Sequence, residues 1–85
     1  MAEVDLLYFG SLRESLGRER ERVDPPSHVL TLADLIAWLA ARGEPYASAL
    51  AGDVRGAVEA HMAGPGDSFF GAREVALFPP PGAIS

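Results

Sequence analysis

The chain has 85 residues, which is enough for one domain and too few for two hydrophobic cores. It contains no cysteine, which excludes disulfides, thiol nucleophiles and thiolate metal sites and fits a reducing cytoplasm. Its 7 basic residues are all arginine, and 12 acidic residues give a net charge of −5, so nucleic acids and anionic membranes are poor partners. The absence of lysine also excludes Schiff-base chemistry through a side chain.

The first segment of the chain is apolar. Residues 4–9, Val-Asp-Leu-Leu-Tyr-Phe, predict an inner strand because both of its faces are mostly apolar. Ser11 and Glu14 have the spacing of a capping box, and Gly17 suits the left-handed position after a helix. We therefore expect a short helix over residues 12–16.

A charged segment follows this helix. Residues 18–24 alternate arginine with acidic residues and end at two prolines. This pattern predicts an exposed edge strand that resists further pairing. Continuation of the preceding helix is the alternative, and Gly17 disfavours it.

The main helix begins at Thr31, which can cap it with Asp34 at the third helical position. Apolar residues recur at helical spacing and predict one face packed on a core: Leu32, Leu35, Ile36 and Leu39. Gly43 is expected to end this helix.

The next segments give weaker signals. Residues 46–50 are expected to form one more helical turn, and residues 54–62 a single weak strand. Residues 63–67 form a turn rich in glycine, and Phe69 and Phe70 are expected to cover the core.

The last segment is a short apolar run closed by prolines. Residues 75–78, Val-Ala-Leu-Phe, predict a strand near the middle of the sheet, covered on both faces. Residues 79–81 are prolines, which cannot continue the ladder and favour an extended segment. Gly82 to Ser85 then form a small tail, which we interpret as the working part of the chain. A disordered terminus is the alternative reading.

The order of elements predicts an α+β architecture. One main helix must cover one face of a mixed four- to five-stranded sheet. The first and last strands are expected to be central, adjacent and parallel. We expect one domain over residues 1–81 and a flexible C-terminal tail over 82–85.

Three stretches together resemble the sulfur-carrier family of the ubiquitin-like β-grasp fold. They are residues 7–14 (Leu-Tyr-Phe-Gly-Ser-Leu-Arg-Glu) with Gly17, the helix start at 31–35, and residues 74–80 (Glu-Val-Ala-Leu-Phe-Pro-Pro). They follow the order and spacing of the MoaD-like members, the small subunits of molybdopterin synthase. The resemblance therefore covers the whole chain and implies the β-grasp fold.

The resemblance also implies a function. It predicts a cytoplasmic, non-catalytic subunit of a sulfurtransferase complex, with no cofactor of its own and no catalytic residue. In that family, an adenylating, E1-like enzyme uses ATP and Mg²⁺ in trans to activate the terminal carboxylate, which becomes a thiocarboxylate. The tail then enters the large subunit of molybdopterin synthase, where its sulfur helps to build the dithiolene of molybdopterin. These two proteins are the expected partners.

The tail departs from the family pattern. Ala83 and Ile84 occupy the positions of the family's terminal Gly-Gly, and Ser85 follows them. The residues expected to carry the thiocarboxylate are thus Gly82, Ala83, Ile84 and Ser85. Three explanations stay open: the tail is trimmed, the chain is altered, or this member does not carry sulfur. Another departure is Glu59-Ala60-His61, where the family has an Asn-centred turn.

Two other classes of function remain. A ubiquitin-like interaction module without carrier chemistry is the main alternative, because the terminal Gly-Gly is absent. A small stand-alone enzyme is disfavoured by the lack of cysteine and lysine. His28 and His61 are isolated in the sequence and predict no metal site.

A single main helix leaves the other face of the sheet open. Leu7 or Phe9 with Ala76 or Phe78 could form an apolar patch there, or loops could cover them. The resemblance favours a patch beside the last strand. The expected partner-binding residues are Phe9, Phe78, Pro79 and Pro80.

Overall fold

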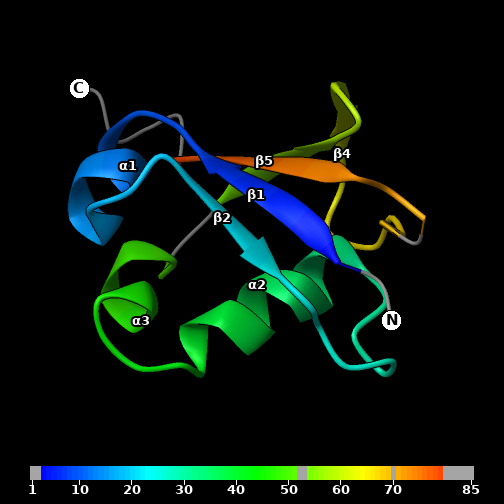
Figure 1. The fold of residues 1–85 in the computed structure, drawn as a ribbon, viewed down its shortest axis with the longest axis horizontal. Coiled ribbons are helices and arrows are strands. Elements are labelled where there is room, and N and C mark those ends of the chain that lie inside the picture. Colours follow the sequence, from blue (N-terminus) through cyan, green and yellow to red (C-terminus); the bar gives the residue numbers. More distant parts are fainter. Residues whose placement is uncertain (1–2, 52–53, 70, 80–85) are drawn as a thin grey trace.

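The computed structural model describes residues 3–51, 54–69 and 71–79, and within them three helices lie against one five-stranded sheet (Figure 1). The elements in chain order are β1 (Val4–Tyr8), α1 (Ser11–Leu16), β2 (Arg20–Val23), α2 (Leu32–Ala40), α3 (Tyr46–Ala49), β3 (Arg55–Val58), β4 (His61–Ala63) and β5 (Glu74–Phe78). The strand order is β2-β1-β5-β3-β4. The α+β fold with a mixed sheet is therefore confirmed.

The first and last strands form the centre of the sheet. β1 and β5 are parallel, with Leu6 opposite Val75 and Tyr8 opposite Leu77. The other neighbours are antiparallel, and β2 lies at the edge beside β1. The expectations of a central parallel pair and a charged edge strand are both confirmed.

The core lies between the sheet and its helices, which all cover the same face (Figure 1). Alternate residues of β1 and β5 point into it, because successive strand residues face opposite sides. Leu35 and Leu39 of α2 are fully buried against them. Phe69 is also buried, as expected, whereas Phe70 lies outside the described residues.

The sheet face away from the helices is not covered to the same extent. Ala76 and Phe78 of β5 are half-buried there, while Val75 and Leu77 on the helix side are fully buried. The expectation that both faces of the last strand are covered is therefore wrong. All three helices lie on one face of the sheet, so they cannot screen the other face from solvent.

The helix ends show two correct capping predictions and two errors. Thr31 caps α2 with a complete capping box to Asp34. α2 ends at Ala40, earlier than the predicted stop at Gly43. Ser11 does not cap α1, because Gly10 is the N-cap residue and makes no side-chain bond. Gly17 does adopt the left-handed conformation that ends α1.

The segment predicted as one strand over residues 54–62 is instead a hairpin. β3 and β4 pair with Ala57 opposite Met62, and Glu59 and Ala60 form the turn with positive φ values of 50° and 70°. The Glu59 carboxylate accepts bonds from the amides of Arg73 and Glu74, both at 2.7 Å. These bonds tie the hairpin to the start of β5.

Among residues 3–51, 54–69 and 71–79, no helix is long and apolar enough to cross a membrane. The predicted domain boundary at residue 81 and the tail over 82–85 lie outside the part of the chain that the structure describes.

Candidate functional site

An aromatic pair lies where the two central strands end. The rings of Phe9 and Phe78 stack, with centroids 5.0 Å apart and planes 13° apart. Phe9 is 44% exposed, and Phe78 is half-buried. Such a large apolar pair left open to solvent is typical of a surface that another protein covers. The structure thus brings together two of the four predicted partner-binding residues.

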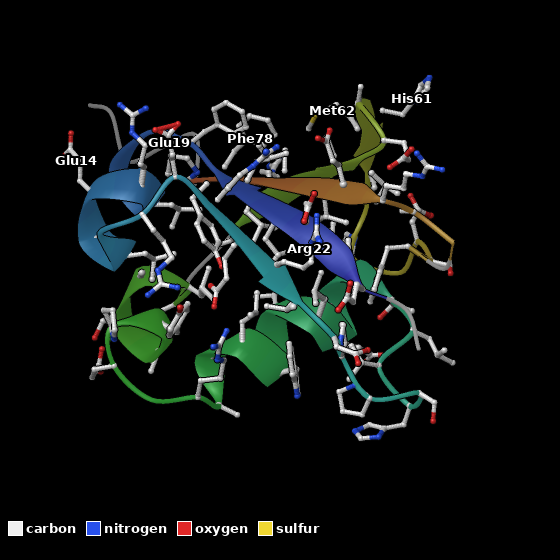
Figure 2. All side chains as sticks on the ribbon, viewed as in Figure 1. Glu14, Glu19, Arg22, His61, Met62 and Phe78 are labelled. Atoms are coloured by element: carbon white, nitrogen blue, oxygen red, sulfur yellow. The ribbon has the colours of Figure 1, made fainter. Side chains whose placement is uncertain are left out.

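An apolar row crosses the same face beside this pair. The strand registers place Leu7 next to Ala76, Ala76 next to Ala57, and Ala57 next to Met62. Met62, on edge strand β4, is 68% exposed. Figure 2 shows Met62 and Phe78 on the side of the sheet away from α2. We call the apolar residues of this face the open-face surface: Leu7, Phe9, Ala57, Met62, Ala76 and Phe78, of which Ala57 is itself buried.

Ion pairs border the open-face surface. Arg22 Nε donates to Asp5 Oδ1 at 2.9 Å, and Arg20 Nη2 lies 3.4 Å from Glu74 Oε2. The hydrogen bond from Arg22 lowers the pKa of Asp5, which therefore stays ionised at neutral pH. The surface is thus an apolar centre with a charged rim, which resembles the anatomy of protein interfaces.

The chain leaves the sheet at a tight crossing beside the aromatic pair. Phe9 N donates to Leu77 O at 3.1 Å, which holds the end of β1 against the end of β5. Gly10 has a φ of 59°, and a Cβ there would lie 3.0 Å from Pro79 Cγ. Glycine is therefore needed at position 10 both for its backbone and for the closeness of Pro79.

Of the remaining predicted site residues, the structure describes Pro79 alone. Pro79 is half-buried beside Gly10. Pro80 and the predicted carrier tail, Gly82 to Ser85, lie outside the described residues. Their roles stay predictions.

A polar cluster that the sequence reading missed lies on the helix side of the sheet. The Glu21 Oε1 atom accepts bonds from the Tyr8 and Tyr46 hydroxyls, each at 2.9 Å. Its Oε2 atom lies 3.0 Å from Arg42 Nη1 and 3.3 Å from Arg18 Nη1. The cluster joins β1, β2, α3 and the end of α2, so its role is to hold these elements together.

The charges of this cluster are set by competing effects. Burial alone would raise the pKa of Glu21, but the bonds from Tyr46, Tyr8 and Arg42 outweigh it and lower that pKa. Burial and the bond to Glu21 raise the pKa of Tyr8. The carboxylate is therefore ionised and the phenols are neutral at physiological pH. A signal for this cluster existed, since alternation places Glu21 on the same strand face as buried Val23.

No metal site is found among the described residues, where no group of three His, Cys, Asp or Glu side chains is positioned to bind an ion. His61 lies exposed at the β3–β4 hairpin, with its Nδ1 atom 3.0 Å from Glu59 O. A groove of about 720 Å³ between α2 and the β3–β4 hairpin is lined by apolar residues and one charged residue, Arg55.

Solved structures share this fold. Small archaeal modifier protein 1 from Haloferax volcanii matches in two crystal structures, at 24% and 25% identity and TM-scores of 0.70 and 0.71. These matches cover 93% and 94% of this chain and 96% and 99% of the other. A protein described as molybdopterin converting factor, subunit 1, from Pyrococcus furiosus matches at 22% identity with a TM-score of 0.73, over 94% of this chain and 99% of that one.

No curated protein sequence matches the chain significantly. The model of the ThiS family, however, matches residues 6–82, from the first central strand to the beginning of the predicted tail. β5, the aromatic pair and the crossing at Gly10 lie inside this match, and so does β1 from Leu6 onward. The chain is therefore a ubiquitin-like β-grasp protein that belongs to the ThiS family.

Proposed function

We propose that this protein is the sulfur-carrying small subunit of a molybdopterin synthase. Its terminal carboxylate would be converted to a thiocarboxylate and would deliver sulfur for the dithiolene of molybdopterin. Membership of the ThiS family supports this function, and so does the likeness in fold to the Pyrococcus furiosus protein. The fold alone does not choose among carriers, because small archaeal modifier protein 1 shares it.

The observation that carries the proposal is the position of the stacked Phe9 and Phe78 rings at the end of β5. A partner that buries this pair would grip the sheet one residue before Pro79. The residues that follow would then leave the sheet inside the complex rather than in bulk solvent. An apolar docking surface next to the chain exit is the arrangement that a tethered carrier requires, because docking then places the tail at the partner's active site.

In this proposal the activation chemistry belongs to the partners. An adenylating enzyme would bind ATP and Mg²⁺, as the resemblance to the sulfur-carrier family implies. The terminal carboxylate would attack the α-phosphorus with loss of pyrophosphate, and a sulfur nucleophile would then displace AMP from the acyl carbon. The large synthase subunit would be the second partner and the acceptor of the sulfur.

A second candidate function is a ubiquitin-like interaction module without carrier chemistry. Ala83 and Ile84 favour it, because Cβ atoms near the terminal carbon hinder entry into a narrow active site. The open-face surface would serve both functions equally.

The terminal carboxylate itself separates these two candidates. The chain is incubated with the adenylating enzyme of its own organism, ATP, Mg²⁺ and a sulfur donor, and its intact mass is measured. A matched variant carries Ala83→Gly and Ile84→Gly and lacks Ser85. We expect the glycine-ended variant to exchange one oxygen for sulfur efficiently and the unchanged chain to do so poorly.

Two other outcomes of this assay are informative. Efficient sulfur gain by the unchanged chain would establish sulfur carriage and show that the bulky tail is no obstacle. As a positive control, the same enzyme is given a carrier that it is known to modify. If that carrier gains sulfur and neither form of this chain does, the interaction module is the function that remains.

A further inference from the structure

The outer edge of β2 is open to a further strand. Within the part of the chain that the structure describes, β2 has one neighbouring strand, β1, and lies at the end of the sheet (Figure 1). Tyr8 N donates to Glu19 O at 2.9 Å, so these two residues form a hydrogen-bonded pair. Hydrogen-bonded and non-hydrogen-bonded pairs alternate along an antiparallel ladder. Arg20 and Arg22 therefore direct their main-chain N–H and C=O groups away from β1, where another strand can bind them.

The side chains that this edge presents on the open face of the sheet are both arginine. Arg20 lies opposite Leu7, and Arg22 lies opposite Asp5, so both side chains project on that face. They are 59% and 67% exposed. Glu21, which lies between them, points to the helix side and belongs to the polar cluster there. The alternating sequence thus becomes a row of positive charge along one side of the edge.

Both guanidinium groups keep donors for a second acceptor. The bond from Arg22 to Asp5 uses Nε, and Arg20 meets Glu74 through Nη2 at 3.4 Å. A guanidinium carries five N–H donors, so each arginine can bind another carboxylate while it keeps its present ion pair. An added strand would bring its side chains next to these arginines, at the distance of a cross-strand pair.

We propose that the outer edge of β2 binds an extended segment of another protein that carries acidic residues at alternate positions. The acidic residues, at positions i and i+2 of the segment, would lie opposite Arg20 and Arg22. The two main chains would exchange up to about four hydrogen bonds, as in other cases of strand addition. The residue between the two acids would lie beside the carboxylate of Glu21, so it should not be acidic.

Charge also disfavours a second copy of this chain as the occupant. Two β2 edges that paired through their outward-facing residues would set arginine opposite arginine, and like charges directly opposite each other are destabilising. The net charge of −5 adds repulsion between copies. The arginines thus reject an identical edge and select an acidic strand, which is one way that charge provides specificity. Binding at β2 requires no activated terminus, so it is independent of the proposed sulfur carriage.

The test is a nuclear magnetic resonance titration of the full, isotope-labelled chain with two synthetic peptides. The acidic peptide is Gly-Thr-Glu-Val-Glu-Thr-Gly, and the basic peptide has lysine in place of both glutamates. Wild type is compared with a double reversal on β2, Arg20→Glu with Arg22→Glu. The matched control is Arg13→Glu with Arg73→Glu, which changes the net charge equally at two exposed residues outside β2. The ion pairs lost on β2 are exposed and contribute little to folding, which circular dichroism checks.

The acidic peptide should shift the amide resonances of Arg20 and Arg22 and slow their hydrogen exchange. It should bind wild type about tenfold more tightly than the basic peptide does, because two cross-strand charge pairs separate the two peptides. The double reversal on β2 should invert this preference, and the matched control should keep it. Equal affinities for the two peptides, no binding of the acidic peptide at millimolar concentration, or equal loss of the preference in both double variants would overturn the proposal.

Discussion

At the scale of single residues, the β3–β4 turn stores backbone strain. Ala60 has a φ of 70°, a conformation that costs a residue with a Cβ about 1–2 kcal/mol. We expect Ala60→Gly to raise the free energy of unfolding by about 0.5–1 kcal/mol, because part of the relief is offset by the greater freedom of glycine in the unfolded chain. Chemical denaturation measures the change.

The control for this prediction is Ala33→Gly on the exposed side of α2, where φ is helical. Glycine there should lower the free energy of unfolding by about 1 kcal/mol. If Ala60→Gly lowers the denaturation midpoint as much as Ala33→Gly does, the turn is not strained.

Glu21 gives a prediction on pH. Its side chain is only 10% exposed, accepts hydrogen bonds from two tyrosines and forms ion pairs with two arginines. Glu21→Gln should lower the free energy of unfolding at pH 7 by about 1–3 kcal/mol, because buried donors lose a charged acceptor. Tyr46→Phe, which removes one of these bonds, should cost less.

The sign of the pH effect follows from the lowered pKa of Glu21 in the folded protein. The stabilisation is complete above the unfolded value of 4.5 and is lost as pH falls through the lower folded value. The difference in denaturation midpoint between wild type and Glu21→Gln should therefore shrink below about pH 4.5. A constant difference from pH 7 to pH 3 would exclude this account.

A contact of a single residue could be predicted from the sequence only when its partner lies nearby in the chain. The cap at Thr31 could be predicted because both partners lie within one helical turn. The predicted cap at Ser11 was wrong because Gly10 is the N-cap residue. The φ of 59° at Gly10 could not be inferred from the spacing of Ser11 and Glu14 in the sequence. The side chains that contact Glu21 lie on three other elements, far from it in the sequence. The charged run around Glu21 therefore indicated only an exposed edge strand.

At the scale of elements, α2 anchors the core through its buried face. Leu35 is fully buried, whereas Leu30, just before the helix, is 51% exposed. Leu35→Ala should lower the free energy of unfolding by roughly 2–5 kcal/mol, since it removes buried methyl groups and leaves a cavity. Leu30→Ala is the matched control and should cost less than about 1 kcal/mol. Equal losses would refute the assigned face.

The β3–β4 hairpin shows where element prediction failed. Its turn residues, Glu59 and Ala60, lack the glycine or asparagine that signals a tight hairpin. The turn is held instead by the Glu59 carboxylate, which reaches amides at the start of β5, some fourteen residues further along the chain. By contrast, the apolar runs of β1 and β5 correctly indicated central strands, because a strand that lies between two neighbours is more buried and has a more apolar sequence.

At the scale of the whole molecule, the open-face surface should decide partner binding. Phe78→Asp places a carboxylate at the centre of the expected interface, where it would be desolvated without a partner. We expect binding to the large synthase subunit to fall at least about 100-fold, as for loss of an aromatic hot spot. Isothermal titration calorimetry measures the affinity, and far-UV circular dichroism checks the fold.

Leu30→Asp is the control, because it adds the same charge to an exposed apolar residue outside the open-face surface. It should leave the affinity within about twofold of wild type, as expected for a residue outside an interface. Unaltered binding by Phe78→Asp would place the docking surface elsewhere on the molecule.

The parallel pairing of β1 with β5 also governs when this protein can fold. Asp5 meets Glu74, so the centre of the sheet is assembled from the two ends of the sequence. A ribosome releases the first strand long before its partner exists, and contacts of such long range slow folding. The hydrophobic core therefore closes only when residues 74–78 have emerged, so the sheet cannot be completed before β5 has been made.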